Sequence, residues 1–178
     1  VGSGREVRRM KHGKEVWSVS FSPDGGLLAS GDGGRVRVWE VGSGRKVRRM
    51  KHGTEVWSFS PDGRLWASGV WSVSFSPDGR LLASGGGRLV RVWEVGSGRE
   101  MRRMEHGEWV ASVSFSPDGR LLASGGGRLV LVWEVESGRE VRRLEHGAEV
   151  TSVSFSPDGE LLASGGGGLV VVWEVESG

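Results

Sequence analysis

The feature that most constrains this chain is an internal repeat that recurs along almost its whole length. Trp93, Trp133 and Trp173 follow one another at one constant interval, and the same interval separates His106 from His146. A constant period of roughly 40 residues is typical of architectures in which one small structural unit is copied along the chain. Each unit of such a chain contacts only its neighbours, so the fold follows from the structure of one unit.

One copy, residues 106–145, contains four short segments with strand patterns. The segment 110–116 (VASVSFS) alternates apolar and small polar residues, as a half-buried strand does. Two apolar segments follow at 121–126 (LLASGG) and 129–135 (LVLVWEV), and the charged segment 139–145 (REVRRLE) is typical of an outer edge strand. Turn residues such as Ser-Pro-Asp-Gly separate the segments. We therefore predict a four-stranded antiparallel sheet that has to stack on copies of itself.

The repeated motifs resemble those of the WD-repeat β-propeller family. The matching elements are the His before the first strand, the Phe-Ser-Pro-Asp-Gly turn, the Leu-Leu-Ala-Ser-Gly strand and the Val-x-Val-Trp-Glu strand, in which Glu replaces the family's usual Asp. They recur over essentially all 178 residues. The resemblance implies an all-β propeller that forms one domain, 1–178. In this family the blades most often close as rings of seven.

The positions of the repeats predict four complete blades and one abbreviated blade. The interval from Trp39 to Trp93 is longer than one repeat and shorter than two. The segment 56–69 (VWSFSPDGRLWASG) matches the first two strands of a blade and lacks the third and fourth. The predicted blade units are 15–51, the abbreviated unit 54–69, 70–105, 109–145 and 149–175.

The two ends of the chain are expected to complement each other. Residues 1–11 correspond to the fourth strand of a blade, whereas the unit 149–175 has only three strands. In the family that it resembles, such an N-terminal strand closes the last blade, so we expect residues 5–11 to pair with 170–175. The start in mid-repeat without Met suggests a fragment of a longer protein. A ring of about five units, a piece of a larger ring, and a homodimer that completes a larger ring stay open as alternatives.

The abbreviated unit 54–69 is expected to form a two-stranded hairpin between the units 15–51 and 70–105. Trp66 stands where the other copies have Leu, so we expect its larger side chain to pack against a neighbouring blade. An insertion that lies outside the ring is the alternative.

Four histidines occupy one repeat column and four tryptophans another. The resemblance implies a structural network in which each His bonds the strand-two Ser and the strand-three Trp. The Asp that belongs to this network is replaced by Gly in every copy except at Asp32, so we expect a weakened network. Equal ring spacing keeps the histidines apart, and we expect no metal or other cofactor. The predicted structural residues are His12, His52, His106, His146, Trp39, Trp93, Trp133 and Trp173.

Catalysis is not expected, because an active site needs one asymmetric group of residues with separate roles. Almost every Ser, His and Asp of this chain falls in a repeat column. The glycine-rich turns precede no helix, so they fail the test for a phosphate-binding loop. We therefore predict that the protein is not an enzyme.

Twelve arginines fall in the predicted fourth strands and their turns. A sequence pI of about 9.5 favours a surface that binds nucleic acid or another polyanion, whereas a net charge of +2 favours edge protection and local ion pairs. No aromatic residue is interleaved with these arginines, which disfavours nucleic acid. Polyanion binding is kept as the alternative function. The arginines are Arg5, Arg8, Arg9, Arg45, Arg48, Arg49, Arg99, Arg102, Arg103, Arg139, Arg142 and Arg143.

The near-identical copies differ most where the first strand of each unit begins. One column there contains Trp in three copies, Ala111 in another and Thr151 in the last, while the turn beside it hardly changes. Exposed Trp is enriched at binding hot spots, so we predict a non-catalytic scaffold that binds a protein or peptide partner on this face. Drift at tolerant surface positions is the alternative. The predicted partner-binding residues are Lys14, Glu15, Trp17, Thr54, Trp57, Trp71, Glu108, Trp109, Ala148 and Thr151.

The chain contains no cysteine, so it has no disulfide framework and no thiol chemistry. No apolar run reaches membrane-spanning length, and the N-terminal residues do not resemble a signal peptide. We therefore expect a cytoplasmic protein that does not contact a membrane.

Overall fold

The computed structural model describes residues 6–12, 15–52, 57–59, 65–67 and 69–175. These residues form β-strands, numbered β1 to β17, and the turns between them. They contain no helix that is long and apolar enough to cross a membrane. The all-β class predicted from the repeat is confirmed.

Three antiparallel sheets contain four strands each. The first blade contains β1 (Ser18–Phe21), β2 (Leu27–Gly31), β3 (Arg35–Glu40) and β4 (Lys46–Lys51). The second blade contains β7 (Ser72–Phe75), β8 (Leu81–Gly86), β9 (Leu89–Glu94) and β10 (Glu100–Glu105). The third blade contains β11 (Val110–Phe115), β12 (Leu121–Gly126), β13 (Leu129–Glu134) and β14 (Glu140–Glu145).

Two smaller sheets complete the described part of the chain. The fourth blade has three strands, β15 (Ser152–Phe155), β16 (Leu161–Gly166) and β17 (Leu169–Glu174). A separate two-stranded hairpin consists of β5 (Trp57–Phe59) and β6 (Leu65–Ala67).

The Ser-Pro-Asp-Gly turns fix the connection from the first to the second strand of each complete blade. In the third blade Ser116 Oγ donates to Asp118 Oδ1 at 2.6 Å, and the backbone N–H of Gly119 donates to the Ser116 carbonyl at 2.9 Å. Gly119 has a φ of 73°, which a residue with a Cβ rarely adopts. The same turn repeats at the equivalent positions of the other blades, so it sets the same strand register each time.

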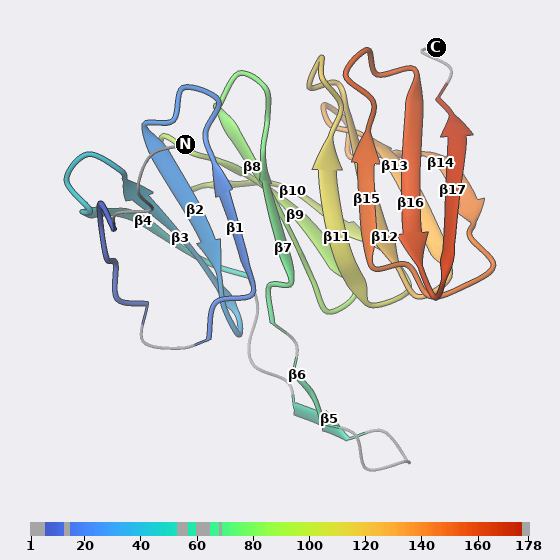
Figure 1. The fold of residues 1–178 in the computed structure, drawn as a ribbon, viewed down its shortest axis with the longest axis horizontal. Helices are drawn as coiled ribbons and strands as arrows, with labels where there is room; N and C mark the ends of the chain where they lie inside the picture. Colours follow the sequence, from blue (N-terminus) through green and yellow to red (C-terminus); the bar gives the residue numbers. More distant parts are fainter. Residues whose placement is uncertain (1–5, 13–14, 53–56, 60–64, 68, 176–178) are drawn as a thin grey trace.

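The four blades stand side by side in a row, with the first blade at one end and the fourth at the other (Figure 1). β7 contacts both β1 and β11, and β11 contacts β15, so the first strands of the blades form one common wall. The hairpin of β5 and β6 projects from the edge of the row at which the first strands begin (Figure 1).

The prediction that the hairpin lies between two blades is wrong, because the first and second blades pack directly together. The backbone N–H of Val73 donates to Ser18 Oγ at 3.0 Å, and that of Val70 donates to the Asp32 carbonyl at 2.8 Å. A unit without a third strand lacks the Val-x-Val segment that fills each interface between blades, so the two complete blades pair instead. The side chain of Trp66 lies outside the described residues.

The prediction that residues 5–11 pair with 170–175 is also wrong. β17 pairs with β16 alone among the described strands, and residues 6–12 form no strand. Arg8 Nε instead donates to the Gly42 carbonyl of the first blade at 3.2 Å. The first and fourth blades lie at opposite ends of the row, so a segment held on the first blade does not reach β17 within one chain.

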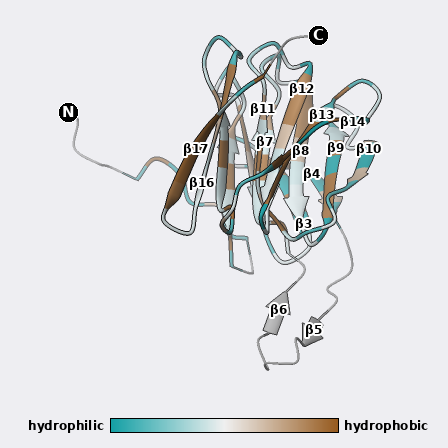
Figure 2. Cartoon of the chain, turned by 90° about the vertical axis from the view of Figure 1, so that its right-hand side faces the viewer, coloured by the Kyte–Doolittle hydropathy of each residue, from teal (hydrophilic) through white to brown (hydrophobic). Residues whose placement is uncertain are grey.

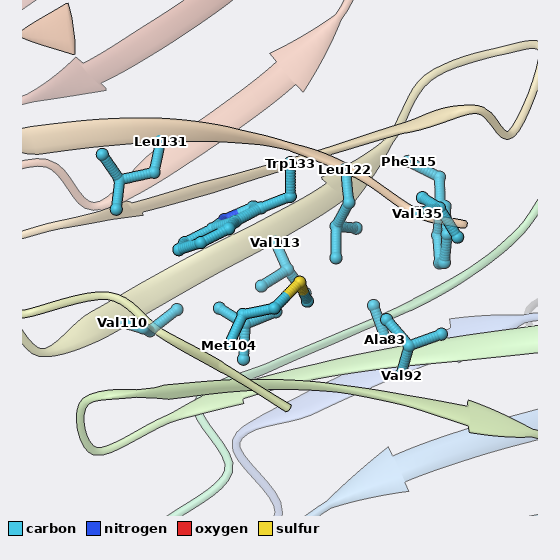
Figure 3. Close-up of a cluster of buried hydrophobic side chains, with 11 residues drawn as sticks. Ala83, Val92, Met104, Val110, Val113, Phe115, Leu122, Leu131, Trp133 and Val135 are labelled. Atoms are coloured by element: carbon cyan, nitrogen blue, oxygen red, sulfur yellow. The ribbon is translucent and has the colours of Figure 1, made fainter. Parts of the chain in front are cut away.

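The hydrophobic core lies between the blades rather than inside them, as Figure 3 shows for the second and third blades. Val92 of β9 and Met104 of β10 lie in one buried cluster with Val113 and Phe115 of β11 and with Trp133 of β13. Equivalent residues form a cluster between the first and second blades and another between the third and fourth. The interface between blades is therefore one structure used three times.

Candidate protein-binding rim

The first strand of each blade begins beside that of its neighbour. The backbone N–H of Trp17 donates to the Gly31 carbonyl at 3.0 Å, and that of Trp71 donates to the Gly85 carbonyl at 2.9 Å. These bonds place the two residues at equivalent positions on adjacent blades. We define the rim as the start of each first strand together with the loop directly before it. Its described members in the variable columns are Glu15, Trp17, Trp71, Glu108, Trp109, Ala111, Ala148, Glu149 and Thr151.

Two tryptophans of the rim stack on each other. The ring centroids of Trp17 and Trp71 are 4.9 Å apart, and the ring planes are inclined by 34°. Trp71 is 41% exposed, while Trp17 is partly buried. A Cβ at Gly69 would lie 1.8 Å from Cζ3 of Trp17, so only glycine allows the indole to lie in this position. The pair therefore presents a preformed aromatic surface that is open on one side.

The rest of the rim is polar or small. Glu15, Glu108 and Thr151 are exposed, whereas Trp109, Ala111 and Ala148 are partly buried. An open groove of about 450 Å³ lies beside Glu108, and it is lined by Glu108, Gly127, Arg128, Leu129, Glu145 and Gly147. The structure thus brings the described rim positions to one edge of the row. Lys14, Thr54 and the side chain of Trp57 lie outside the described residues.

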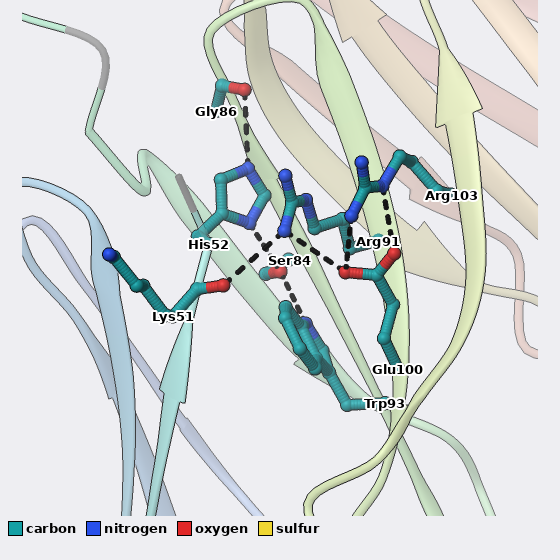
Figure 4. A network of polar contacts seen from close by, with 8 residues as sticks. All are labelled: Lys51, His52, Ser84, Gly86, Arg91, Trp93, Glu100 and Arg103. Carbon is teal, nitrogen blue, oxygen red and sulfur yellow. Dashed lines mark hydrogen bonds and ion pairs between the residues drawn. The ribbon is translucent and has the colours of Figure 1, made fainter. Parts of the chain in front are cut away.

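The polar network behind the rim is complete in the second blade (Figure 4). Trp93 Nε1 donates to Ser84 Oγ at 2.7 Å, Ser84 Oγ lies 2.8 Å from His52 Nδ1, and His52 Nε2 lies 3.2 Å from the Gly86 carbonyl. Because a carbonyl can only accept, His52 carries its proton on Nε2 and accepts from the Ser84 hydroxyl on Nδ1. Each polar group in this buried chain has a partner.

The other blades keep the Trp–Ser bond and vary the histidine. Trp133 Nε1 donates to Ser124 Oγ at 2.7 Å, and Trp173 Nε1 donates to Ser164 Oγ at 2.8 Å. In the third and fourth blades, however, the histidine Nε2 bonds the backbone carbonyl of this serine at 3.3 Å instead of its hydroxyl. Trp39, Trp93 and Trp133 are buried and Trp173 is partly buried, so these residues are part of the packing between blades.

The first blade contains a Ser–His–Asp arrangement that includes Asp32, the one Asp of the network that the sequence retains. His12 Nε2 lies 2.9 Å from Ser30 Oγ, and His12 Nδ1 lies 3.2 Å from Asp32 Oδ2, which is the order of a catalytic triad. Ser30 and Asp32 are buried, and Ser30 Oγ accepts the Trp39 Nε1–H at 2.8 Å. Arg37 also contacts His12 and lies 3.5 Å from Asp32. The hydroxyl is thus enclosed by structural partners and is not placed to attack a substrate.

Desolvation keeps His12, His52 and His106 neutral. Desolvation lowers the pKa of His52 to about 4, and it lowers the pKa of His106 and of His12 from the ordinary value. No group of three or more His, Asp or Glu side chains within the described ranges is placed to hold a metal ion. His12, His52 and His106 therefore act through neutral hydrogen bonds.

A buried arginine is a feature that sequence reasoning missed. Arg91 NH1 lies 3.0 Å from Glu100 Oε2, and Arg103 Nε lies 2.8 Å from the other oxygen of the same carboxylate (Figure 4). Desolvation lowers the pKa of Arg91. The third blade has Leu131 at the position of Arg91, fully buried, so the fold does not require a charge there. A switch between Leu and Arg at one repeat position was the available sequence signal.

The outer arginines are largely engaged within the chain. Arg48 Nε donates to the Gly96 carbonyl at 3.0 Å, and Arg102 Nε donates to the Glu136 carbonyl at 2.8 Å, each across to the next blade. Others form ion pairs with a glutamate on the same segment. These pairs are Arg9 with Glu6, Arg103 with Glu100, and Arg143 with Glu140.

Comparison with known proteins agrees with this architecture. The family model described as "WD domain, G-beta repeat" matches residues 4–40, 66–94, 98–134 and 138–174. A chain in a structure titled "Crystal Structure of Mitotic Checkpoint Complex" is similar at 24% identity and a TM-score of 0.78, and the match covers 94% of this chain and 51% of that chain. The present chain thus spans about half the length of that protein. No curated protein matches the sequence. The four matched repeats show that this chain belongs to the WD40 family.

Proposed function

We propose that the chain is a non-catalytic scaffold that binds a protein or peptide through the rim. The observation that carries the proposal is the stacked pair of Trp17 and Trp71, with 41% of Trp71 exposed. A large aromatic side chain that is fixed in place and partly open gains contact area on binding at little cost in conformational entropy. WD40 propellers are typically interaction scaffolds, and the similar chain belongs to a protein complex by its title.

The charges of the rim favour a partner segment with basic side chains. Glu15, Glu108 and Glu149 are exposed near the starts of three first strands. A Lys or Arg side chain of the partner can lie against the face of Trp71, because an indole attracts a cation that approaches its face. Further basic side chains of the partner can pair with the carboxylates on the other blades. An apolar residue next to that cation would fill the space beside the Trp pair. We therefore propose a basic and apolar peptide segment as the ligand.

Binding of a polyanion by the outer arginines is less well supported. The carbonyl bonds of Arg48 and Arg102 and the ion pairs of Arg103 and Arg143 already use these guanidinium groups. A phosphate would have to compete with partners that are in place before binding. The buried Ser–His–Asp arrangement likewise offers no hydroxyl to a substrate, so the proposed function includes no catalytic step.

A peptide array tests the proposal. Peptides that combine Lys or Arg with an apolar residue should retain the wild-type chain, and matched acidic peptides should not. Trp71→Ala should abolish this binding, and the variant should fold because the third blade already has Ala111 at this position. Arg142→Ala is the matched control on the outer strands and should bind as the wild type does. Retention on heparin with a steep salt dependence, lost in Arg142→Ala and kept in Trp71→Ala, would instead establish polyanion binding.

A further inference from the structure

Two apolar faces are open at the two ends of the row of blades. The trailing face, on the fourth blade, consists of Val170, Val172 and their neighbours, and these two residues are 74% and 59% exposed. Figure 2 shows β17 as a hydrophobic strand at this end. The leading face, on the first blade, contains Val16, Val19 and Phe21, which are 43%, 61% and 61% exposed.

The same positions are buried wherever two blades meet. Val130 and Val132 of the third blade correspond to Val170 and Val172, and both are 0% exposed. Val113 and Phe115 correspond to Val19 and Phe21, and they are 5% and 7% exposed. The leading and trailing faces are therefore the two halves of an interface that this chain already forms three times.

The hydrogen-bonding groups of the interface also have one partner on each face. At the three internal interfaces a backbone N–H of one first strand donates to a serine hydroxyl of the preceding one, at 3.0 to 3.1 Å. These pairs are Val73 with Ser18, Val113 with Ser72, and Val153 with Ser112. Continuation of the pattern would join the N–H of Val19 to the hydroxyl of Ser152. One group lies on the leading face and the other lies on the trailing face.

A glycine on each second strand makes room for the next blade. A Cβ at Gly125 would lie 2.6 Å from Val150 Cγ1, and a Cβ at Gly85 would lie 2.5 Å from Val110 Cγ1. At Gly165 the nearest atoms are 3.9 Å away and belong to the same blade. At the other interfaces, a valine of the next blade occupies the space beside the equivalent glycine. The equivalent valine of the leading face is Val16.

The N-terminal segment already lies where a fourth strand of a preceding blade belongs. Arg8 Nε donates to the Gly42 carbonyl at 3.2 Å, as Arg48 Nε does to the Gly96 carbonyl at 3.0 Å. Met10 lies beside Gly44 as Met50 lies beside Gly98, at 3.8 and 3.7 Å from the position of a glycine Cβ. The sheet that this segment would complete has the strands β15, β16 and β17, and these lie at the other end of the chain.

We propose that the chain associates head to tail with a second copy of itself. The trailing face of one copy packs on the leading face of the other, and residues 6–11 of that second copy add to β17 as its fourth strand. Val36 lies opposite Met50 and Val90 opposite Met104 in the complete blades, so Val170 lies opposite the second copy's Met10. A second copy is the fitting occupant because it carries every apolar and polar group that the three internal interfaces use.

Two such junctions close a pair of chains into a ring with eight blades, which is within the range of known propellers. The interface is of the heterologous type, in which two different surfaces meet. Neither face includes Trp17 or Trp71, so the association can be tested separately from the proposed function.

Sedimentation of face variants tests the head-to-tail arrangement. The wild type should have twice the molar mass of 19.2 kDa that one chain has. Val172→Glu on the trailing face and Phe21→Glu on the leading face should each be monomeric and folded, since both positions are exposed in the single chain. An equal mixture of the two variants should regain a complex of two chains, because one intact junction forms between them. Arg80→Glu, with a side chain that is 86% exposed on the β7–β8 turn, is the charge control and should associate as the wild type does.

Monomeric wild-type protein, a ladder of larger assemblies, or a single variant that still pairs with itself would overturn the proposal. Thiol cross-linking gives a second readout because the chain has no cysteine. Met10→Cys mixed with Val170→Cys should yield a cross-linked pair of chains, since cross-strand neighbours lie about 5 Å apart. Each variant alone should yield none. Efficient cross-linking of Val170→Cys with itself would show that two trailing faces meet, which would also contradict a head-to-tail interface.

Discussion

The indole rings of Trp17 and Trp71 stack with centroids 4.9 Å apart although the strands β1 to β6 all lie between them in the sequence. The contact is possible because the first and second blades pack directly together and the hairpin of β5 and β6 projects outside the row. The abbreviated unit therefore does not disturb the packing of the blades before and after it in the sequence. The same irregularity places two aromatic residues side by side on the rim.

The first prediction is that these two tryptophans stabilise each other. In a double-mutant cycle of Trp17→Ala and Trp71→Ala, the coupling free energy of unfolding should be about 1 kcal/mol, which is typical of an aromatic pair. Denaturant unfolding of the four proteins measures it. Strictly additive effects would show that the rings do not interact in solution.

The second prediction concerns Trp133, which lies in the core between the second and third blades. Trp133→Ala should lower the free energy of unfolding by about 3–5 kcal/mol, because it removes a large buried side chain and leaves the Ser124 hydroxyl without its N–H donor. Trp173→Ala is the matched comparison and should cost less in the monomer, since Trp173 is only partly buried. Equal losses at the two positions would contradict the assigned difference in packing.

Sequence reasoning predicted the all-β class, the repeat and the WD40 family because these depend on local patterns that recur. Strand parity, the Ser-Pro-Asp-Gly turn and the Val-x-Val-Trp-Glu segment are each visible within a few residues. The position of the hairpin and the closure by residues 5–11 were predicted wrongly, since they depend on which apolar surfaces meet. A pattern within one copy does not show whether β1 prefers β5 or β7 as its neighbour.

For the candidate site as well, the sequence predicted local features but not the contacts that depend on the packing of the blades. The column of Trp17 and Trp71 was found from differences between copies, but the stacking of the two rings required the packing of the blades. Asp32 was recognised as the one retained Asp of the histidine network, because the other copies have Gly there. The pair of Arg91 with Glu100 was missed because it joins residues from different segments, and an Arg where another copy has Leu was its sequence signal.

The third prediction is that Arg91 can be replaced by the residue of the next blade. Arg91→Leu recreates the environment of Leu131 and leaves Glu100 paired with Arg103. The free energy of unfolding should be unchanged or should rise by about 1–4 kcal/mol, because a buried ion pair loses hydration that an apolar side chain does not need. Glu100→Ala is the opposite test and should cost roughly 3–5 kcal/mol, since it leaves the buried guanidinium unpaired. A large loss in Arg91→Leu would show that the ion pair itself holds β9 in place.

The fourth prediction is a loss of stability in mild acid through His52. The pKa of His52 is about 4 in the folded protein, whereas the ordinary value of 6.5 applies to the unfolded chain. The unfolded chain therefore takes up a proton first as the pH falls. Stability is therefore present above about pH 6.5 and declines toward pH 4, by up to about 3 kcal/mol from this residue. The pKa values of the partly buried His12 and the buried His106 shift in the same direction.

Denaturant unfolding at pH 7 and pH 5 measures this effect. His52→Gln keeps a hydrogen-bonding side chain that cannot be protonated in this range, so its stability should change less with pH than that of the wild type. The same slope in both proteins would assign the acid sensitivity to other groups.

The most direct measurement of the proposed function is hydrogen exchange of the chain with and without a bound basic and apolar peptide. The bound peptide should slow the exchange of backbone amides at residues 15–18 and 69–72, where Trp17 and Trp71 stand. Exchange in the outer strands β4, β10 and β14 should stay unchanged. Protection of those outer strands with no change around Trp17 and Trp71 would contradict recognition through the rim.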